Sequence, residues 1–238
     1  MNKLIRYIFF IIALLYNTPA YSLDVISHTP KAPNSALIML HGWGGSGKRM
    51  TWLTNKLQDK FSDMAFYYPT AQNKAPHDGY EWFVIPSLGG NMSQNEIYKK
   101  MMSSALLSLK ELHNLIEEIH QTQDIEYENI HIAGFSQGGL MALLTSLTSY
   151  NPIGKTISFS GVPLLFTEDF TPKDIKSIPD ILIIQGDNDH IIPADSYNLT
   201  NKTLKSINIT PNLKIIKNMP HTINNKALSH AIEFLKNK

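Results

Sequence analysis

The sequence contains no cysteine. This absence excludes disulfide bonds, thiolate zinc sites, a cysteine nucleophile and an N-terminal cysteine that could carry a lipid. Lysine and arginine form no run, and their 21 residues nearly balance 20 acidic residues, so the charge pattern gives no basis for binding nucleic acid. Stability must therefore come from a hydrophobic core, and charge alone identifies no partner.

The chain also lacks internal repeats, low-complexity tracts and linkers. Of its 238 residues, 43% are hydrophobic and 17% are charged, which is an ordinary balance for a globular protein. This length suits one sizeable α/β domain better than two complete domains. We expect a single domain over residues 23–238.

The apolar run of residues 8–15 is too short to cross a bilayer comfortably. It follows two basic residues and precedes small residues that form a cleavage site ending at Ser22. This pattern predicts a secretory signal peptide over residues 1–22, and hence a periplasmic or secreted protein with no stable membrane insertion after cleavage. An uncleaved membrane anchor is the alternative.

Short apolar or β-branched runs recur along the rest of the chain, bounded by Gly, Pro, Asn or Asp. They predict strands at residues 36–40, 65–68, 130–133, 156–159, 181–185 and 213–216. Apolar residues at helical spacing predict helices at residues 97–119, 138–150 and 228–235. Strands that alternate with helices indicate an α/β fold with a mostly parallel sheet covered on both faces.

Residues 67–91 follow neither pattern, because prolines, glycines and asparagines break any regular period there. The segment also contains Tyr80, Trp82 and Phe83, which supply aromatic surface. Long loops of this kind often have a function.

A Gly-Phe-Ser-Gln-Gly-Gly sequence at residues 134–139 lies between a predicted strand and a predicted helix. This is the setting of a nucleophile elbow, in which a tight turn presents a serine hydroxyl above the sheet of an α/β-hydrolase fold. The alternative is an ordinary strand-to-helix turn. The flanking strand and helix favour the elbow, with Ser136 as the nucleophile.

A serine needs a base to accept its proton and a carboxylate to orient that base, and both follow the serine in this fold. His221 lies in a loop after the last predicted strand, whereas His230 falls in a helical pattern and His190 adjoins the candidate acids. Of those acids, Asp187 directly follows a glycine and suits a turn. The sequence therefore predicts His221 as the base and Asp189 as its partner, with His190 at the rim.

Acyl transfer also needs two donors directed at the tetrahedral oxyanion. One is expected to be the backbone N–H of Gln137, which follows the nucleophile. Residues 40–47 form a glycine-rich loop after the first predicted strand, and the backbone N–H of Trp43 is the second expected donor.

The same loop has a rival interpretation as a phosphate-binding loop, because Gly42, Gly47 and Lys48 have the required spacing. Arg49, however, stands where Ser or Thr should bind magnesium. An oxyanion loop is the better interpretation.

Together these residues resemble the phospholipase/carboxylesterase family, which includes the acyl-protein thioesterases and small bacterial carboxylesterases. The resemblance covers most of the mature chain and rests on its motifs in order: LHGWGGSG (40–47), YPTA (68–71), the Trp-Phe pair (82–83), GFSQGG (134–139), FSG (159–161), GDNDHIIP (186–193) and His221. It implies the same triad and oxyanion donors, no metal or organic cofactor, and a small acyl ester or lipid as substrate. It also implies that the loop with Trp82 and Phe83 walls the acyl pocket.

The chain departs from the family pattern at two positions. Val84 follows the Trp-Phe pair, where relatives usually have an acidic residue, and Trp43 stands where they commonly have Leu. The bulk of Trp43 favours short- to medium-chain acyl esters. Export is also unlike the cytosolic thioesterases. The alternatives are a secreted polyester depolymerase, a feruloyl-type esterase, or a non-catalytic binding protein with a hydrolase fold; no feature indicates an oligomeric state.

Overall fold

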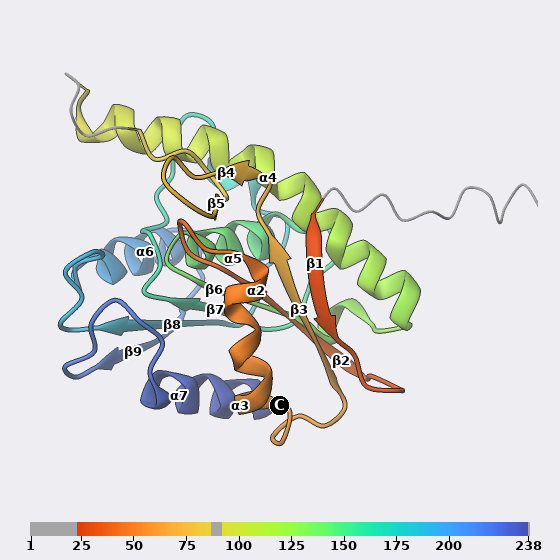
Figure 1. Cartoon of the computed structure of the whole chain (residues 1–238). Helices are drawn as coiled ribbons and strands as arrows, with labels where there is room; N and C mark the ends of the chain where they lie inside the picture. Colours follow the sequence, from red (N-terminus) through yellow and green to blue (C-terminus); the bar gives the residue numbers. More distant parts are fainter. Residues whose placement is uncertain (1–22, 87–91, 238) are drawn as a thin grey trace, which may run out of the picture.

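The computed structural model describes residues 23–86 and 92–237. Its centre is a seven-stranded sheet with the order β1-β3-β2-β6-β7-β8-β9 (Figure 1). These strands are β1 (Asp24–His28), β2 (Ser35–Leu40), β3 (Met64–Thr70), β6 (Ile130–Phe135), β7 (Thr156–Phe159), β8 (Ile181–Gly186) and β9 (Asn212–Ile216). Edge strand β1 runs antiparallel to β3, and the other neighbours are parallel. The predicted fold class is therefore confirmed.

Helices occupy both faces of this sheet (Figure 1). They are α2 (Gly47–Met50), α3 (Thr54–Leu57), α4 (Gln94–Gln123), α5 (Gln137–Thr148), α6 (Ser196–Lys205) and α7 (Asn225–Lys236). Short 3-10 turns lie at η1 (Thr51–Leu53), η2 (Tyr127–Asn129) and η3 (Pro172–Asp174). In the described part of the chain, no helix combines the length and the apolar character that crossing a membrane requires.

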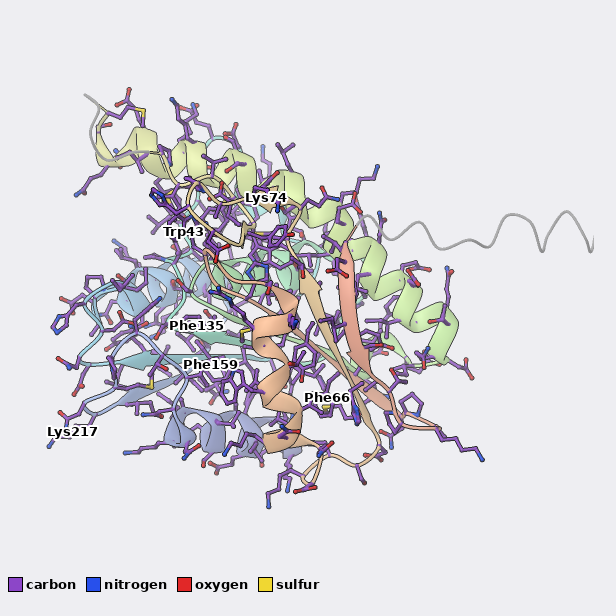
Figure 2. All side chains as sticks on the ribbon, in the orientation of Figure 1. Trp43, Phe66, Lys74, Phe135, Phe159 and Lys217 are labelled. Atoms are coloured by element: carbon purple, nitrogen blue, oxygen red, sulfur yellow. The ribbon has the colours of Figure 1, made fainter. Side chains whose placement is uncertain are left out.

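Successive side chains of β2 point to opposite faces of the sheet, so the strand contributes to two core clusters. Ala36, Ile38 and Leu40 pack in a cluster with the buried residues of α4 and α5. Leu37 and Met39 point the other way, into a cluster with residues of α2, η1, α3 and α7. Both faces of β2 are thus buried, which explains why it reads as a continuous apolar run. Figure 2 shows the side chains that fill these two layers.

The long helix α4 begins at a capping box. The Ser93 hydroxyl accepts a hydrogen bond from the Glu96 N–H at 3.3 Å, and the Glu96 carboxylate accepts one from the Ser93 N–H at 2.7 Å. The helix ends at Asp124, which has the left-handed conformation common at helix ends (φ 54°). The predicted helix over residues 97–119 lies within these bounds.

The segment predicted as one irregular loop, residues 67–91, contains regular structure. Its first four residues belong to β3, and β4 (Asn73–Lys74) pairs with β5 (Tyr80–Glu81) in a small antiparallel hairpin. Residues 87–91 lie outside the described residues, as does the predicted signal peptide at residues 1–22.

Candidate active site

Four loops with candidate site residues meet at one edge of the sheet. Trp43 follows β2, Ser136 follows β6, Asp189 follows β8 and His221 follows β9. Because these strands are parallel, their carboxyl ends share one edge, which is where ligands bind in open α/β sheets. The topology therefore gathers residues that are up to 178 positions apart in the sequence.

Ser136 occupies a strained turn between β6 and α5, with φ 55° and ψ −114°. A positive φ is unfavourable for a residue with a Cβ, so the surroundings must hold this conformation. The Ser136 N–H donates to the Phe159 carbonyl at 2.9 Å, and the Ser136 carbonyl accepts from Gly139 at 3.0 Å and Val162 at 3.2 Å. Strand β7 and helix α5 together fix the elbow.

Glycines allow the backbone around Ser136 to pack this closely. A Cβ at Gly134 would overlap the Gly138 carbonyl, and a Cβ at Gly138 would lie 2.5 Å from the Leu40 carbonyl oxygen. A Cβ at Gly42 would lie 3.3 Å from that of Ser136, so the loop after β2 runs directly beside the serine.

His221 and Asp189 form the central polar contact of the site. His221 Nδ1 lies 2.8 Å from Asp189 Oδ2, which also accepts from Gln185 Nε2 at 3.2 Å. Asp189 Oδ1 accepts from the backbone N–H groups of Ile191 at 3.0 Å and Ile192 at 2.9 Å. Burial acts to raise the pKa of Asp189, but these hydrogen bonds outweigh it, and the pKa lies below its usual value.

The two loops that carry this pair are held together by backbone contacts. The Asn188 N–H donates to the Met219 carbonyl at 3.2 Å, and a Cβ at Gly186 would overlap that same carbonyl. Asp187 accepts from the Asn218 N–H at 2.6 Å. Asp187 thus bonds a backbone N–H, as its position suggested, but in the neighbouring loop.

The other two downstream histidines lie apart from this contact. His230 is on α7, with Nδ1 3.9 Å from Glu233, and the His190 side chain is exposed. Within the described residues, neither makes a hydrogen bond to Ser136 or Asp189.

The His221 imidazole reaches the elbow by packing against Phe135, the residue before the serine. The two ring centroids are 4.6 Å apart at an interplanar angle of 41°. Across the described ranges, no hydrogen bond joins Ser136 to His221. Catalytic hydrogen bonds are often long without substrate and tighten in the reacting complex.

The two expected oxyanion donors are unpaired in the described structure. Neither the backbone N–H of Trp43 nor that of Gln137 donates to an acceptor among residues 23–86 and 92–237. Gln137 opens helix α5, whose first N–H groups have no partner within the helix. Both N–H groups therefore remain available to an anion.

Comparisons with known proteins assign the chain to a family. The family model described as phospholipase/carboxylesterase matches residues 22–238. The chain belongs to the phospholipase/carboxylesterase family. "Acyl-protein thioesterase 1" of Eremothecium gossypii is 29% identical over 212 residues, covering 84% of this chain and 86% of that protein. A "Probable carboxylesterase SOBER1-like" of Arabidopsis thaliana is 26% identical over 239 residues, covering 97% and 88% respectively.

The crystal structure of esterase PE8 is similar over 90% of this chain and 98% of its own, with a TM-score of 0.80 and 27% identity. Family membership and these relatives identify the chain as an enzyme, a serine hydrolase of carboxylesterase or thioesterase type. The predicted family and enzyme class are confirmed.

The family resemblance implied an acyl-pocket wall at Trp82 and Phe83, and the structure corrects this expectation. Both residues are 0% exposed and belong to the hydrophobic core. The Trp82 indole donates to the His41 carbonyl at 2.9 Å, while the Gln137 side chain accepts from the Trp82 N–H at 3.1 Å and donates to the Phe83 carbonyl at 2.8 Å. Because both rings are enclosed by protein, the pair supports the backbone of the site and does not form the wall of an acyl pocket.

His41 is a supporting residue that sequence reasoning missed. It is fully buried, its Nε2 accepts from the Ala71 N–H at 3.0 Å, and its Nδ1 lies 2.7 Å from the Gly42 carbonyl. Since Nε2 accepts, the proton must be on Nδ1, where it donates to Gly42. Burial lowers the pKa of His41 to about 4, although the Gly42 bond opposes that shift. A neutral His41 therefore anchors the start of the loop after β2.

The rival phosphate-loop interpretation fails on contacts within the same loop. The Gly47 N–H donates to the Thr70 hydroxyl at 3.1 Å, and a Cβ at Gly47 would overlap the Tyr68 carbonyl. A phosphate would need such N–H groups free and facing it. The structure also brings no group of three or more His, Asp or Glu side chains within reach of one metal ion in the described ranges.

Proposed function

We propose that this chain is an exported serine carboxylesterase or thioesterase that hydrolyses short- to medium-chain acyl esters. The observation that carries the proposal is the 2.8 Å hydrogen bond between His221 and Asp189 beside the strained Ser136 elbow. A buried carboxylate that holds an imidazole beside a serine at a strained elbow is the arrangement that acyl transfer requires.

In the proposed reaction, the Ser136 hydroxyl attacks the substrate carbonyl while His221 Nε2 takes its proton. Asp189 holds the imidazole in the tautomer with Nδ1–H and stabilises its positive charge. The oxyanion is bound by the backbone N–H groups of Trp43 and Gln137. The carbon–oxygen or carbon–sulfur bond breaks as His221 gives the proton to the leaving alcohol or thiol, and water then hydrolyses the acyl-serine by the same steps.

The decisive test is covalent labelling with a fluorophosphonate probe together with hydrolysis of p-nitrophenyl butyrate. We expect Ser136→Ala to abolish both, with a residual rate at least about a thousandfold below wild type. Ser160→Ala is the matched control, because Ser160 also has a positive φ (45°) and its buried hydroxyl has no partner in the described structure. Labelling that persists in Ser136→Ala would overturn the proposal, and a wild-type chain that neither labels nor hydrolyses esters would indicate a binding protein.

The proposed chain-length range rests on Trp43, a bulky side chain that is 43% exposed and follows Gly42, where an added Cβ would lie 3.3 Å from that of Ser136. Each methylene that the site can bury adds up to about 0.8 kcal/mol, so the rate should climb with acyl length and then stop. We expect the highest rate of hydrolysis for acyl chains of about four to eight carbons. A nitrophenyl ester panel from acetate to palmitate, with feruloyl and hydroxybutyrate esters as further arms, measures this. Faster hydrolysis of palmitate, or of either further ester, would replace the proposed substrate class.

Export is proposed from the N-terminal pattern, and the start of the folded domain supports it. Leu23 is buried, and β1 begins at Asp24 and pairs with β3, so the sheet includes residues directly after the expected cleavage point. Mass spectrometry of the protein from fractionated cells should give a mature chain that starts at Leu23 in the periplasm or medium. An intact chain in the membrane fraction would favour the anchor instead.

A further inference from the structure

Glu81 is a buried carboxyl group with one protein hydrogen bond. The residue is 5% exposed, and its Oε2 accepts from the indole N–H of Trp43 at 2.7 Å. No Lys, Arg or His of the described ranges forms a salt bridge with it. Burying a carboxyl group without a cationic partner is unfavourable unless hydrogen bonds compensate for the lost water. The contact with Trp43 is what this carboxyl group contributes.

Trp43 is held by a backbone bond that spans it, from the Gly45 N–H to the Gly42 carbonyl at 3.0 Å, and by the bond from its indole to Glu81. It lies between glycines, and Gly44 has a positive φ of 69°. The residue is 43% exposed, so packing covers only part of it. The bond from the indole to Glu81 is therefore the side-chain restraint on the residue whose backbone N–H is the proposed oxyanion donor.

Backbone contacts reinforce this restraint on either side of Glu81. The Gly44 N–H donates to the Tyr80 carbonyl at 2.9 Å, and the Tyr80 N–H donates to the Gly45 carbonyl at 3.0 Å. The hairpin can lie this close because position 79 is glycine, with φ 71°; a Cβ there would overlap the Gly44 carbonyl. Figure 2 labels Trp43 and Lys74, the hairpin residue that pairs with Tyr80.

The two residues after Glu81 hold the other proposed donor. The Gln137 side chain bonds the backbone of both Trp82 and Phe83, at 3.1 and 2.8 Å. Residues 80–83 therefore contact both halves of the proposed oxyanion hole, through Trp43 on one side and Gln137 on the other.

We propose that Glu81 is a positioning residue that sets the backbone N–H of Trp43 for the oxyanion. It touches no reacting atom and acts through the indole of Trp43. This inference rests on the proposed function, because it assumes that Trp43 is an oxyanion donor. An interaction that orients a transition-state donor affects kcat, whereas substrate binding in the ground state changes little.

The experiment compares three variants on p-nitrophenyl butyrate. Glu81→Leu removes the acceptor, and we expect kcat to fall roughly 10- to 100-fold with KM within about threefold, since loss of a whole oxyanion donor costs about 100- to 1000-fold. Glu81→Gln keeps an acceptor oxygen and should retain kcat within about threefold. Trp43→Phe removes the indole N–H from the other side and should match Glu81→Leu, while the double variant should add little because the two residues act as one unit.

Glu128→Leu is the matched control, because Glu128 is exposed at the opposite, amino end of β6. Its kcat should equal that of wild type. Wild-type kcat in Glu81→Leu, or equal losses in Glu81→Leu and Glu81→Gln, would overturn the inference. If Glu81→Leu does not fold, the comparison of Trp43→Phe with Glu81→Gln replaces it. An unchanged kcat in Trp43→Phe would then overturn the inference.

The same assay separates failure of this inference from failure of the proposed function. Retained activity in Ser136→Ala would remove the proposed function itself. An inactive Ser136→Ala together with fully active Glu81→Leu and Trp43→Phe would leave the serine mechanism standing and remove only the role of Glu81.

Discussion

Asp189 stays ionised inside the protein because its hydrogen bonds favour the charged form. Burial raises the pKa of this carboxyl, but the His221 imidazole and the backbone N–H groups of Ile192 and Ile191 lower it by more. A charged Asp189 accepts the proton on His221 Nδ1 in a hydrogen bond and leaves Nε2 with its lone pair. Asp189 thus selects the tautomer of His221 in which Nε2 is free to accept a proton.

This reasoning predicts that Asp189→Asn lowers kcat by roughly 1000- to 10,000-fold, because an amide can donate to Nδ1 and stabilise the wrong tautomer. Stopped-flow or steady-state kinetics on p-nitrophenyl butyrate measures the loss. Asp187→Asn is the control, since the amide oxygen can still accept from the Asn218 N–H. Similar losses of kcat in both variants would show that the role of the triad carboxylate does not belong to Asp189 alone.

The Gln137 side chain supports a second prediction, on stability. It satisfies the Trp82 N–H and the Phe83 carbonyl, which lie next to fully buried rings. Gln137→Ala leaves both groups unpaired, so we expect a loss of roughly 2 to 4 kcal/mol in the free energy of unfolding. Urea denaturation tests this, with the exposed Gln121→Ala expected within about 0.5 kcal/mol of wild type. A loss below about 0.5 kcal/mol in Gln137→Ala would mean that water replaces the amide as the hydrogen-bond partner of the Trp82 N–H and the Phe83 carbonyl.

The sequence predicts Ser136, Asp189 and His221 as a triad because each follows a recognisable strand and the fold fixes their order, and the kinetic variants test that assignment. It could not predict that Glu81 meets Trp43, since the contact spans 38 positions and depends on the hairpin turning back on the loop after β2. His41 was missed for a similar reason: its partner Ala71 is 30 positions away. A lone polar residue carries no periodic signal of its contacts.

At the scale of secondary structure, prediction succeeded where apolar periodicity was strong. Strand β2 is buried on both faces, and α4 buries one continuous stripe, so both left clear patterns. Strand β1 and helix α6 were missed because β1 is a largely exposed edge and α6 is mostly polar, with only Thr200, Thr203 and Leu204 buried. The β4–β5 hairpin pairs two residues on each strand, which is too few for any period.

The burial of Trp82 turns the hairpin region into part of the core and carries a prediction. Trp82→Ala should lower the free energy of unfolding by roughly 3 to 5 kcal/mol through the cavity it leaves. Activity on every acyl chain length should fall by the same factor, because the ring touches no substrate. Trp52→Ala, at a Trp that is 40% exposed, should cost less stability. Selective loss of activity on long esters alone in Trp82→Ala would restore this residue to the acyl pocket.

For the whole molecule, histidines whose pKa is lowered in the folded state couple folding to pH, and buried His41 and half-buried His131 are shifted furthest. Burial lowers the pKa of His41 to about 4, against a small opposing effect of its bond to Gly42. Burial, followed by the positive charge of Lys155, lowers the pKa of His131 to about 4 as well. These residues lie at opposite ends of the parallel strands, after β2 and near the start of β6. Acid should therefore reduce stability through residues at both ends of the parallel strands.

The sign of this coupling follows from the proton balance. Unfolded histidines take up protons below pH 6.5, whereas both native residues resist protonation until about pH 4. Stability is therefore fully present above pH 6.5 and is lost as the pH falls from 6.5 towards 4. By pH 5 the loss should be about 2 kcal/mol for each histidine, a sizeable part of the 5 to 15 kcal/mol of a typical domain.

Urea denaturation of the mature protein at pH 7.5 and pH 5 measures this loss. His131→Asn keeps an acceptor for the Lys155 N–H, which His131 Nδ1 binds at 2.9 Å. This variant cannot titrate at position 131, so we expect it to lose about 2 kcal/mol less than wild type between the two pH values. The exposed His190→Asn should show the wild-type loss. Equal pH dependence in wild type and His131→Asn would show that His131 does not become protonated on unfolding in this range, and the acid sensitivity would then have to come from other groups.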